Sequence, residues 1–248
     1  MSIIDAIKTP YARFPNAVGT QDLLKALAFW TMFIDHLGMC FFPEDPIMRA
    51  IGRSSAPIWF FFVGYNFKYR ATLLDGLLVC AILFSIIKYI LIDQIMPLHI
   101  LFSLIICRIV IGYYAKYMVH ASILSSSTWF IMIMAALGLL LPTQHIFEYG
   151  TLGILVAIWG YNCRHQIGDK LFKTLIIGLI QSVDVFEFTI HHLIRLISVS
   201  LTVYLLYKFK PMTLNIHGIS KYFINISARY SMYLYCIHLS LFFWLSKA

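Results

Sequence analysis

Charged side chains, and acidic ones above all, are scarce in this chain. Only 12% of its 248 residues are charged and only 11 are Asp or Glu, whereas 60% are hydrophobic. The mean hydropathy is +0.81. Soluble globular domains carry about 25% charged residues. The composition therefore excludes an ordinary soluble enzyme and predicts an all-α, polytopic membrane protein folded as a bundle of helices.

The sequence also lacks the usual patterns that hold a metal or a phosphate. Its five cysteines form no C-x-x-C pair and lie within or beside apolar runs, as small buried hydrophobic residues do. They are Cys40, Cys80, Cys107, Cys163 and Cys236. No glycine-rich phosphate cradle occurs. We therefore expect neither a disulfide framework nor a metal site, and a phosphorylated ligand would have to be held in another way.

Apolar runs of nearly the length that crosses a bilayer recur along the whole chain. They lie at residues 23–42, 54–67, 73–92, 97–115, 128–142, 146–162, 171–190, 193–207 and 228–246. We predict about nine transmembrane helices, eight to ten, in one domain over residues 23–248 that follows a cytoplasmic segment over residues 1–22. That segment has no apolar core before a small-residue cleavage site, so we expect no removable signal peptide.

Lysine and arginine alternate between successive loops, and this alternation predicts the orientation. One set of loops carries Lys8, Arg13, Lys68, Arg70, Lys116, Arg164, Lys170, Lys173, Lys208, Lys210 and Lys221. The opposite set carries Glu44, Asp45, Asp93, Glu148 and Asp184. The basic loops and the N-terminus should be cytoplasmic. The formal charge of +8 then reflects membrane topology and is a poor argument for nucleic-acid binding.

The first apolar run contains three ionisable side chains, Lys25, Asp35 and His36. A charge near mid-bilayer costs roughly 2.5 to 3.5 kcal/mol, so such groups usually line a cavity or a functional site. Lys25 and His36 are eleven residues apart, which puts them on one helix face, about 16 Å apart along the axis. This face is a candidate site for a long, charged ligand.

Two later side chains join these candidates, each with a structural alternative. Arg53 opens the aromatic run at 54–67, where it could pair with Asp35, bind an anionic ligand, or extend to the membrane surface. His238 is buried among aromatic residues of the last run, where a lone histidine often only bonds a neighbouring helix. A weaker group is more consistent with a charged connector. It comprises Asp184, Glu187, His191, His192 and Arg195.

Several of these residues lie in motifs that resemble the TraX family of conjugative pilin acetylases. The opening motif comprises residues 24–28 (LKALA), Met32, residues 34–36 (IDH), 51–53 (IGR) and 56–58 (API). Residues 100–102 (ILF), 149–155 (YGTLGIL) and 235–239 (YCIHL) resemble later motifs. The family tends to have Asn where this chain has His99. The resemblance covers most of the helical region.

This resemblance implies a multi-pass acetyltransferase of the bacterial inner membrane. Acetyl-CoA would be the donor, and the N-terminal amine of processed pilin would be the acceptor. Membrane acyltransferases that O-acetylate polysaccharides are similar in one detail, an Arg followed by ten residues and a His. Lys25 and His36 have this spacing, with Lys in place of Arg. The Arg/Gln-x-x-Gly-x-Gly/Ala turn of soluble acetyltransferases does not occur.

The predicted catalytic residues are His36, Asp35 and His238. Acetyl transfer to an amine needs a proton acceptor, and a buried neutral imidazole such as His36 suits that role. Asp35 and His36 point about 100° apart on a helix, so we predict that Asp35 pairs with Arg53 and does not orient His36. The residues predicted to bind coenzyme A are Lys25, Arg53, Lys68 and Arg70, although the positive-inside pattern alone explains Lys68 and Arg70.

Two other functions fit the same residues. An O-acetyltransferase for a glycan or a lipid headgroup would use the same donor and the same histidine. A transporter or assembly factor without enzymatic activity would use the buried polar groups to relay protons or to fix helix packing.

Overall fold

The computed structural model describes residues 18–68, 76–93, 96–118, 126–167 and 190–247, and these residues are almost entirely helical, as predicted. The helices are α2 (Thr20–Phe41), α3 (Pro46–Gly52), α4 (Ser55–Tyr65), α5 (Gly76–Ile92), α6 (Ile100–Tyr113), α7 (Ser126–Gly138), α8 (Leu140–Gln144), α9 (Gly150–His165), α11 (Ile190–Lys208), α12 (Ile219–Arg229) and α13 (Ser231–Leu245). A π-helical turn, η2 (Tyr114–Met118), extends α6, and β1 (Val18–Gly19) pairs antiparallel with β2 (Thr213–Leu214).

The prediction of nine transmembrane helices is not confirmed. Eight of the nine apolar runs coincide with helices, and the run at 171–190 lies outside the described residues except for Ile190. By length and hydropathy, the described residues contain two helices that could cross a membrane, Thr20–Phe41 and Ile100–Tyr117. The apolar helices α5 and α13 are shorter. These helices indicate membrane association, and several other elements are too short to span a bilayer alone.

Two helices lie where the sequence predicted loop. The short helix α3 starts with Pro46 in its first turn, and the Asp45 side chain accepts a hydrogen bond from the Ile47 N–H. Helix α12 occupies the later part of the stretch between the last two apolar runs. It packs against α2 and exposes Ile219 and Phe223. Neither helix has a long apolar run, which is why a search for membrane spans misses both.

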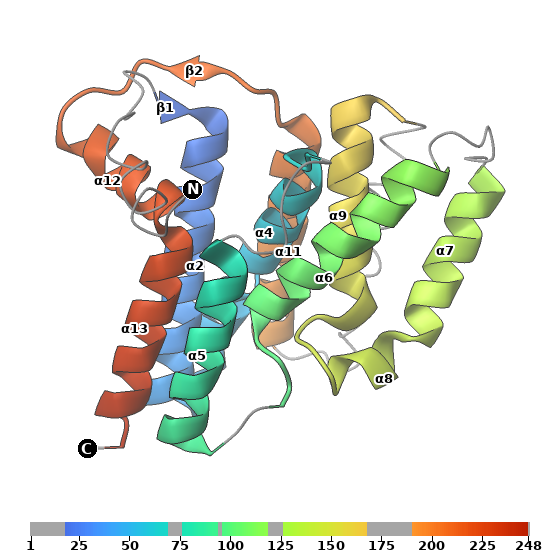
Figure 1. Ribbon diagram of the computed structural model, residues 1–248. Helices are drawn as coiled ribbons and strands as arrows, with labels where there is room; N and C mark the ends of the chain where they lie inside the picture. Colours follow the sequence, from blue (N-terminus) through green and yellow to red (C-terminus); the bar gives the residue numbers. More distant parts are fainter. Residues whose placement is uncertain (1–17, 69–75, 94–95, 119–125, 168–189, 248) are drawn as a thin grey trace.

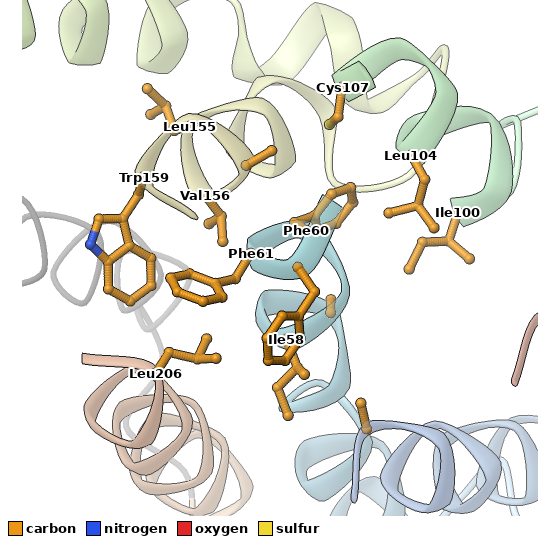
Figure 2. Packing of buried hydrophobic residues seen from close by; sticks show 14 of the residues in the cluster. Ile58, Phe60, Phe61, Ile100, Leu104, Cys107, Leu155, Val156, Trp159 and Leu206 are labelled. Carbon is orange, nitrogen blue, oxygen red and sulfur yellow. The ribbon is translucent and has the colours of Figure 1, made fainter. Parts of the chain in front are cut away.

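The core centres on the contact between α4 and α9. A side chain at Gly64 would overlap the Ala157 carbonyl, and one at Gly160 would overlap the Phe61 carbonyl, so glycine alone permits this close crossing. The Phe61 ring contacts the Trp159 ring, with the two ring centroids 4.9 Å apart. Figure 2 shows Phe61 of α4 between Trp159 of α9 and Leu206 of α11.

Helices α2, α5 and α13 lie side by side at one edge of the molecule (Figure 1). The β1–β2 pair and α12 lie at the upper end of this group, and the C-terminus lies at the lower end. Helix α3 follows α2 directly and packs back against it. This arrangement brings the lower half of α2, the end of α3 and the middle of α13 together, and the candidate site forms there.

Candidate active site

Two histidines from opposite ends of the chain meet between α2 and α13. His36 Nδ1 and His238 Nε2 lie 2.8 Å apart, and the two rings are stacked with centroids 5.0 Å apart. His238 is also surrounded by the rings of Phe29, Phe33 and Phe242. The sequence predicted both histidines as candidates, and the fold places them in direct contact.

The hydrogen bonds of this pair assign its protons. His238 Nδ1 lies 2.6 Å from the Leu234 carbonyl oxygen, which can only accept, so this nitrogen carries a hydrogen. In a neutral imidazole, His238 Nε2 is then an acceptor, and His36 Nδ1 must donate to it. His36 Nε2 is left without a hydrogen. The pair therefore presents His36 Nε2 as a base whose tautomer is fixed by His238.

The hydrogen-bond partner of Asp35 is not the predicted Arg53, although Arg53 acts on this carboxylate through its charge. Its Oδ2 accepts a hydrogen bond from Arg49 Nη1 at 3.3 Å, and Arg53 Nη1 donates to the Tyr149 hydroxyl at 3.5 Å instead. The unpredicted helix α3 explains the exchange, because it carries Arg49 back over α2. A side chain at Gly52 would overlap Asp35, so only glycine lets α3 end against it.

A cavity of about 350 Å³ opens beside these groups, and we name it the histidine cavity. Asp35, His36, Arg49 and Arg53 line it from α2 and from α3 with its following turn. The polar side chains that line it from elsewhere are Ser55, Lys88, His99, Glu148, Tyr149 and Tyr235. His238 is not among the lining residues, so it supports His36 from behind the cavity wall.

Most of the polar residues that line the histidine cavity from elements other than α2 and α3 were not predicted as site residues. Lys88 is a lone cation in an apolar run, the signal that identified Lys25, and Arg49 lies one turn before Arg53. Glu148 and Tyr149 gave no such signal because they precede α9 in a loop. The Ile100 N–H donates to the Glu148 carboxylate, and burial raises the pKa of this carboxyl while Arg53 and Lys88 oppose the rise.

A second cavity, of about 320 Å³, lies at the other end of α2, and we name it the lysine cavity. Lys25, Lys68 and Arg108 line it, together with Asn66 and the ring of Phe62. The Lys25 ammonium lies 5.8 Å from the centre of that ring. Two of the predicted coenzyme A residues, Lys25 and Lys68, therefore meet in one cavity, while Arg53 lines the other and Arg70 lies outside the described residues.

A small apolar cavity of about 90 Å³ adjoins both of the larger ones. It shares Trp59 and Leu77 with the lysine cavity. It shares Met32, Ile100 and Tyr235 with the histidine cavity. Lys25 and His36 thus do not line one surface, as the helix spacing predicted, but two cavities with a small apolar cavity between them.

The weaker polar group predicted near the later helices lies partly outside the described residues. Asp184 and Glu187 lie outside the described residues, as does the side chain of His191. His192 and Arg195 belong to α11 and are half-buried. Neither residue lines the two larger cavities.

One comparison with known proteins identifies a family. Residues 20–246 match the profile of a family described as TraX protein. An uncharacterized protein of Rickettsia prowazekii (strain Madrid E), RP591, is 32% identical over 151 residues, which cover 61% of this chain and 58% of that protein. No solved structure matches the chain.

Proposed function

Because the chain belongs to the TraX family, we propose that it acetylates the N-terminal amine of processed conjugative pilin with acetyl-CoA as donor. One observation carries the proposal. His36, with Nε2 free to accept a proton, lines one cavity, and a small apolar cavity lies between it and a second, cation-lined cavity. The histidine cavity would hold the thioester of acetyl-CoA, the small apolar cavity its arm, and the lysine cavity its phosphates.

The donor would enter at the lysine cavity. Lys25, Lys68 and Arg108 supply the positive charge that the coenzyme's phosphates require, in place of a glycine-rich loop. The slender arm of the coenzyme would pass the apolar cavity between Trp59 and Tyr235. The arm would have to span the separation of Lys25 from His36, which is about 16 Å along the helix.

The transfer itself needs a neutral amine, a base and donors for the thioester oxygen. The amine nitrogen attacks the thioester carbon while His36 Nε2 takes one of its protons, and the carbon–sulfur bond breaks as the carbon–nitrogen bond remains. The protonated His36 then gives this proton to the departing thiolate. Arg49 and Arg53 line the same cavity and supply N–H groups for the negative charge on the carbonyl oxygen.

The acceptor, processed pilin, would reach the protein from within the membrane. We place the protein in the bacterial inner membrane as a multi-pass protein with its N-terminus in the cytoplasm, because its basic loops follow the positive-inside pattern. The lysine cavity, at the end of α2 nearer the N-terminus, would then face the cytoplasm, where acetyl-CoA is made. The histidine cavity would face the opposite half of the membrane, where the amine of a membrane-inserted pilin is accessible.

The test is the intact mass of mature pilin from cells that carry the wild-type protein, the His36→Ala variant, or neither. Membrane levels of each form are measured in parallel. His217→Ala is the matched control, because His217 is exposed before α12 and away from both cavities. We expect one added acetyl group with wild type and with His217→Ala, and none with His36→Ala.

Each other outcome contradicts a defined part of the proposal. Unmodified pilin in the presence of wild type would show that pilin is not the acceptor and would favour a glycan or lipid headgroup. Full acetylation by a normally inserted His36→Ala variant would move the base to another group, with His238 next in order.

A further inference from the structure

Two buried side chains of the histidine cavity each keep one polar atom without a hydrogen-bond partner. Among the described residues, Asp35 Oδ1 and His99 Nδ1 have none, although Asp35 is 8% exposed and His99 only 3%. Both residues line the cavity that His36 lines. Buried polar atoms normally have a hydrogen-bond partner. Two such atoms without one, on residues of the same cavity, therefore indicate a ligand that supplies the missing hydrogen bonds.

Both orphan atoms are acceptors. Asp35 Oδ2 is occupied by Arg49, and Oδ1 of a carboxylate that pairs with a guanidinium carries no hydrogen. His99 Nε2 lies 3.1 Å from the Ala81 carbonyl oxygen, so Nε2 holds the hydrogen of the ring. Nδ1 of the neutral imidazole is then bare, and the neighbouring rings of Phe84, Phe102 and Tyr235 disfavour a charged form. The missing partner must therefore be a donor.

The charges of the cavity decide which donor fits. Three cations, Arg49, Arg53 and Lys88, face two carboxylates, Asp35 and Glu148, so the cavity has an excess of positive charge. This excess disfavours an ammonium ion and favours the neutral amine. A neutral primary amine has two N–H groups, one for each orphan acceptor, and still keeps its lone pair for attack. A hydroxyl has one hydrogen and can satisfy one of the two.

We propose that Asp35 and His99 form the subsite that binds the acceptor's amine and makes the protein select an amine over a hydroxyl. The inference rests on the proposed acetyl transfer and adds residues that recognise the acceptor. Tyr235 links this subsite to the base, since its ring centroid lies 5.4 Å from that of His36 and 6.4 Å from that of His99. His99 acts as a positioning residue that holds the nitrogen while His36 takes the proton.

The test uses the full-length protein purified in detergent, with acetyl-CoA and two short acceptor peptides. The peptides are identical except that one ends in an α-amino group and the other in an α-hydroxyl group. His99→Phe keeps an aromatic ring among Phe84 and Phe102 but removes Nδ1. His99→Gln restores an acceptor, and Ser85→Ala is the matched control, because Ser85 contacts His99 only through Nε2.

We expect His99→Phe to raise KM for the amine peptide about tenfold and to lower the amine-to-hydroxyl preference by a similar factor. KM for acetyl-CoA should not change, His99→Gln should recover most of the loss, and Ser85→Ala should behave as wild type. An unchanged KM in His99→Phe, or an equal loss for both peptides, would overturn the subsite.

A binding measurement separates this inference from the proposed function. The melting temperature of the protein is measured without acetyl-CoA, with the amine peptide or with its N-acetylated form. If only the amine peptide stabilises wild type, and His99→Phe loses this effect, the subsite stands even where no acetyl group is transferred. If wild type acetylates the amine but its stabilisation by the peptide does not depend on His99, the subsite is wrong and the proposed function remains.

Discussion

The histidine cavity and the lysine cavity differ in how their polar side chains are held. In the histidine cavity most of these groups have fixed partners: His36 bonds His238, Asp35 bonds Arg49, Arg53 bonds Tyr149, and Lys88 Nζ donates to the Pro97 carbonyl. In the lysine cavity, the Lys25 ammonium lies over the Phe62 ring, and Lys68 is exposed.

This difference fits the proposed function, in which the histidine cavity performs the chemistry and the lysine cavity binds the phosphates. A proton transfer depends on the position and tautomer of one nitrogen, so its neighbours must be fixed. A phosphate group accepts hydrogen bonds from many directions, so flexible cations suffice to bind it. Substitutions in the histidine cavity should therefore change kcat, and those in the lysine cavity should change KM for acetyl-CoA.

The largest effect is expected for His36→Gln. Glutamine fills a similar volume but cannot take a proton, so kcat should fall by about 10² to 10⁴, which is the usual contribution of a general base. KM for acetyl-CoA should stay within a factor of about two, since the lysine cavity is intact. Steady-state kinetics with purified protein and an amine peptide test this. A variant that raises KM and keeps kcat would show that His36 binds the donor and is not the base.

His238→Phe should have the next largest effect. The phenyl ring keeps the contacts with Phe29, Phe33 and Phe242 but cannot accept the hydrogen of His36 Nδ1. The tautomer of His36 is then no longer fixed, and we expect kcat to fall about 10- to 100-fold, by analogy with the loss of a partner that orients a metal-binding histidine. The melting temperature measured alongside kcat is the control. Wild-type kcat in a folded His238→Phe protein would show that His36 needs no orienting partner.

The sequence predicted the helices of this site better than their meeting points. Long apolar runs located α2 and α13, and the rarity of charge within them singled out His36 and His238. Spacing along α2 could not show that Lys25 and His36 line different cavities, because the small apolar cavity between them is lined by Trp59, Leu77 and Tyr235 on other helices. Periodicity describes one helix at a time, and cavities are shared between several.

The partner of Asp35 was mispredicted for a related reason. Arg49 and Arg53 are four residues apart and equally charged, so the choice between them depends on the path of the chain after α2. That path is set by the short helix α3, which is capped by Asp45 and ends at Gly52 against Asp35. A helix of seven residues is too short to give a recognisable sequence pattern. The positions of Arg49 and Arg53 relative to Asp35 nevertheless depend on it.

Lys25→Ala should affect the other cavity. Loss of the ammonium removes one charged contact to a phosphate, so KM for acetyl-CoA should rise about tenfold while kcat stays near wild type. Lys25→Arg should retain most of the affinity because it keeps the cation. The kinetics are measured at two salt concentrations, and the loss should be smaller at high salt, where the wild-type contact is itself screened. A fall in kcat with unchanged KM would place Lys25 among the catalytic groups and erase the distinction between the two cavities.

The smallest effect is expected for Lys68→Ala, and it limits how far the lysine cavity extends. Lys68 is exposed, so its attraction for a phosphate acts through water and is weak. KM for acetyl-CoA should rise about two- to threefold, and the change should vanish at high salt. Lys247→Ala removes an exposed cation near the C-terminus and is the control for net charge. If Lys68→Ala matched Lys25→Ala in size, the phosphates would bind at the rim of the cavity, and the arm of the coenzyme would need to reach further to bring its thioester to His36.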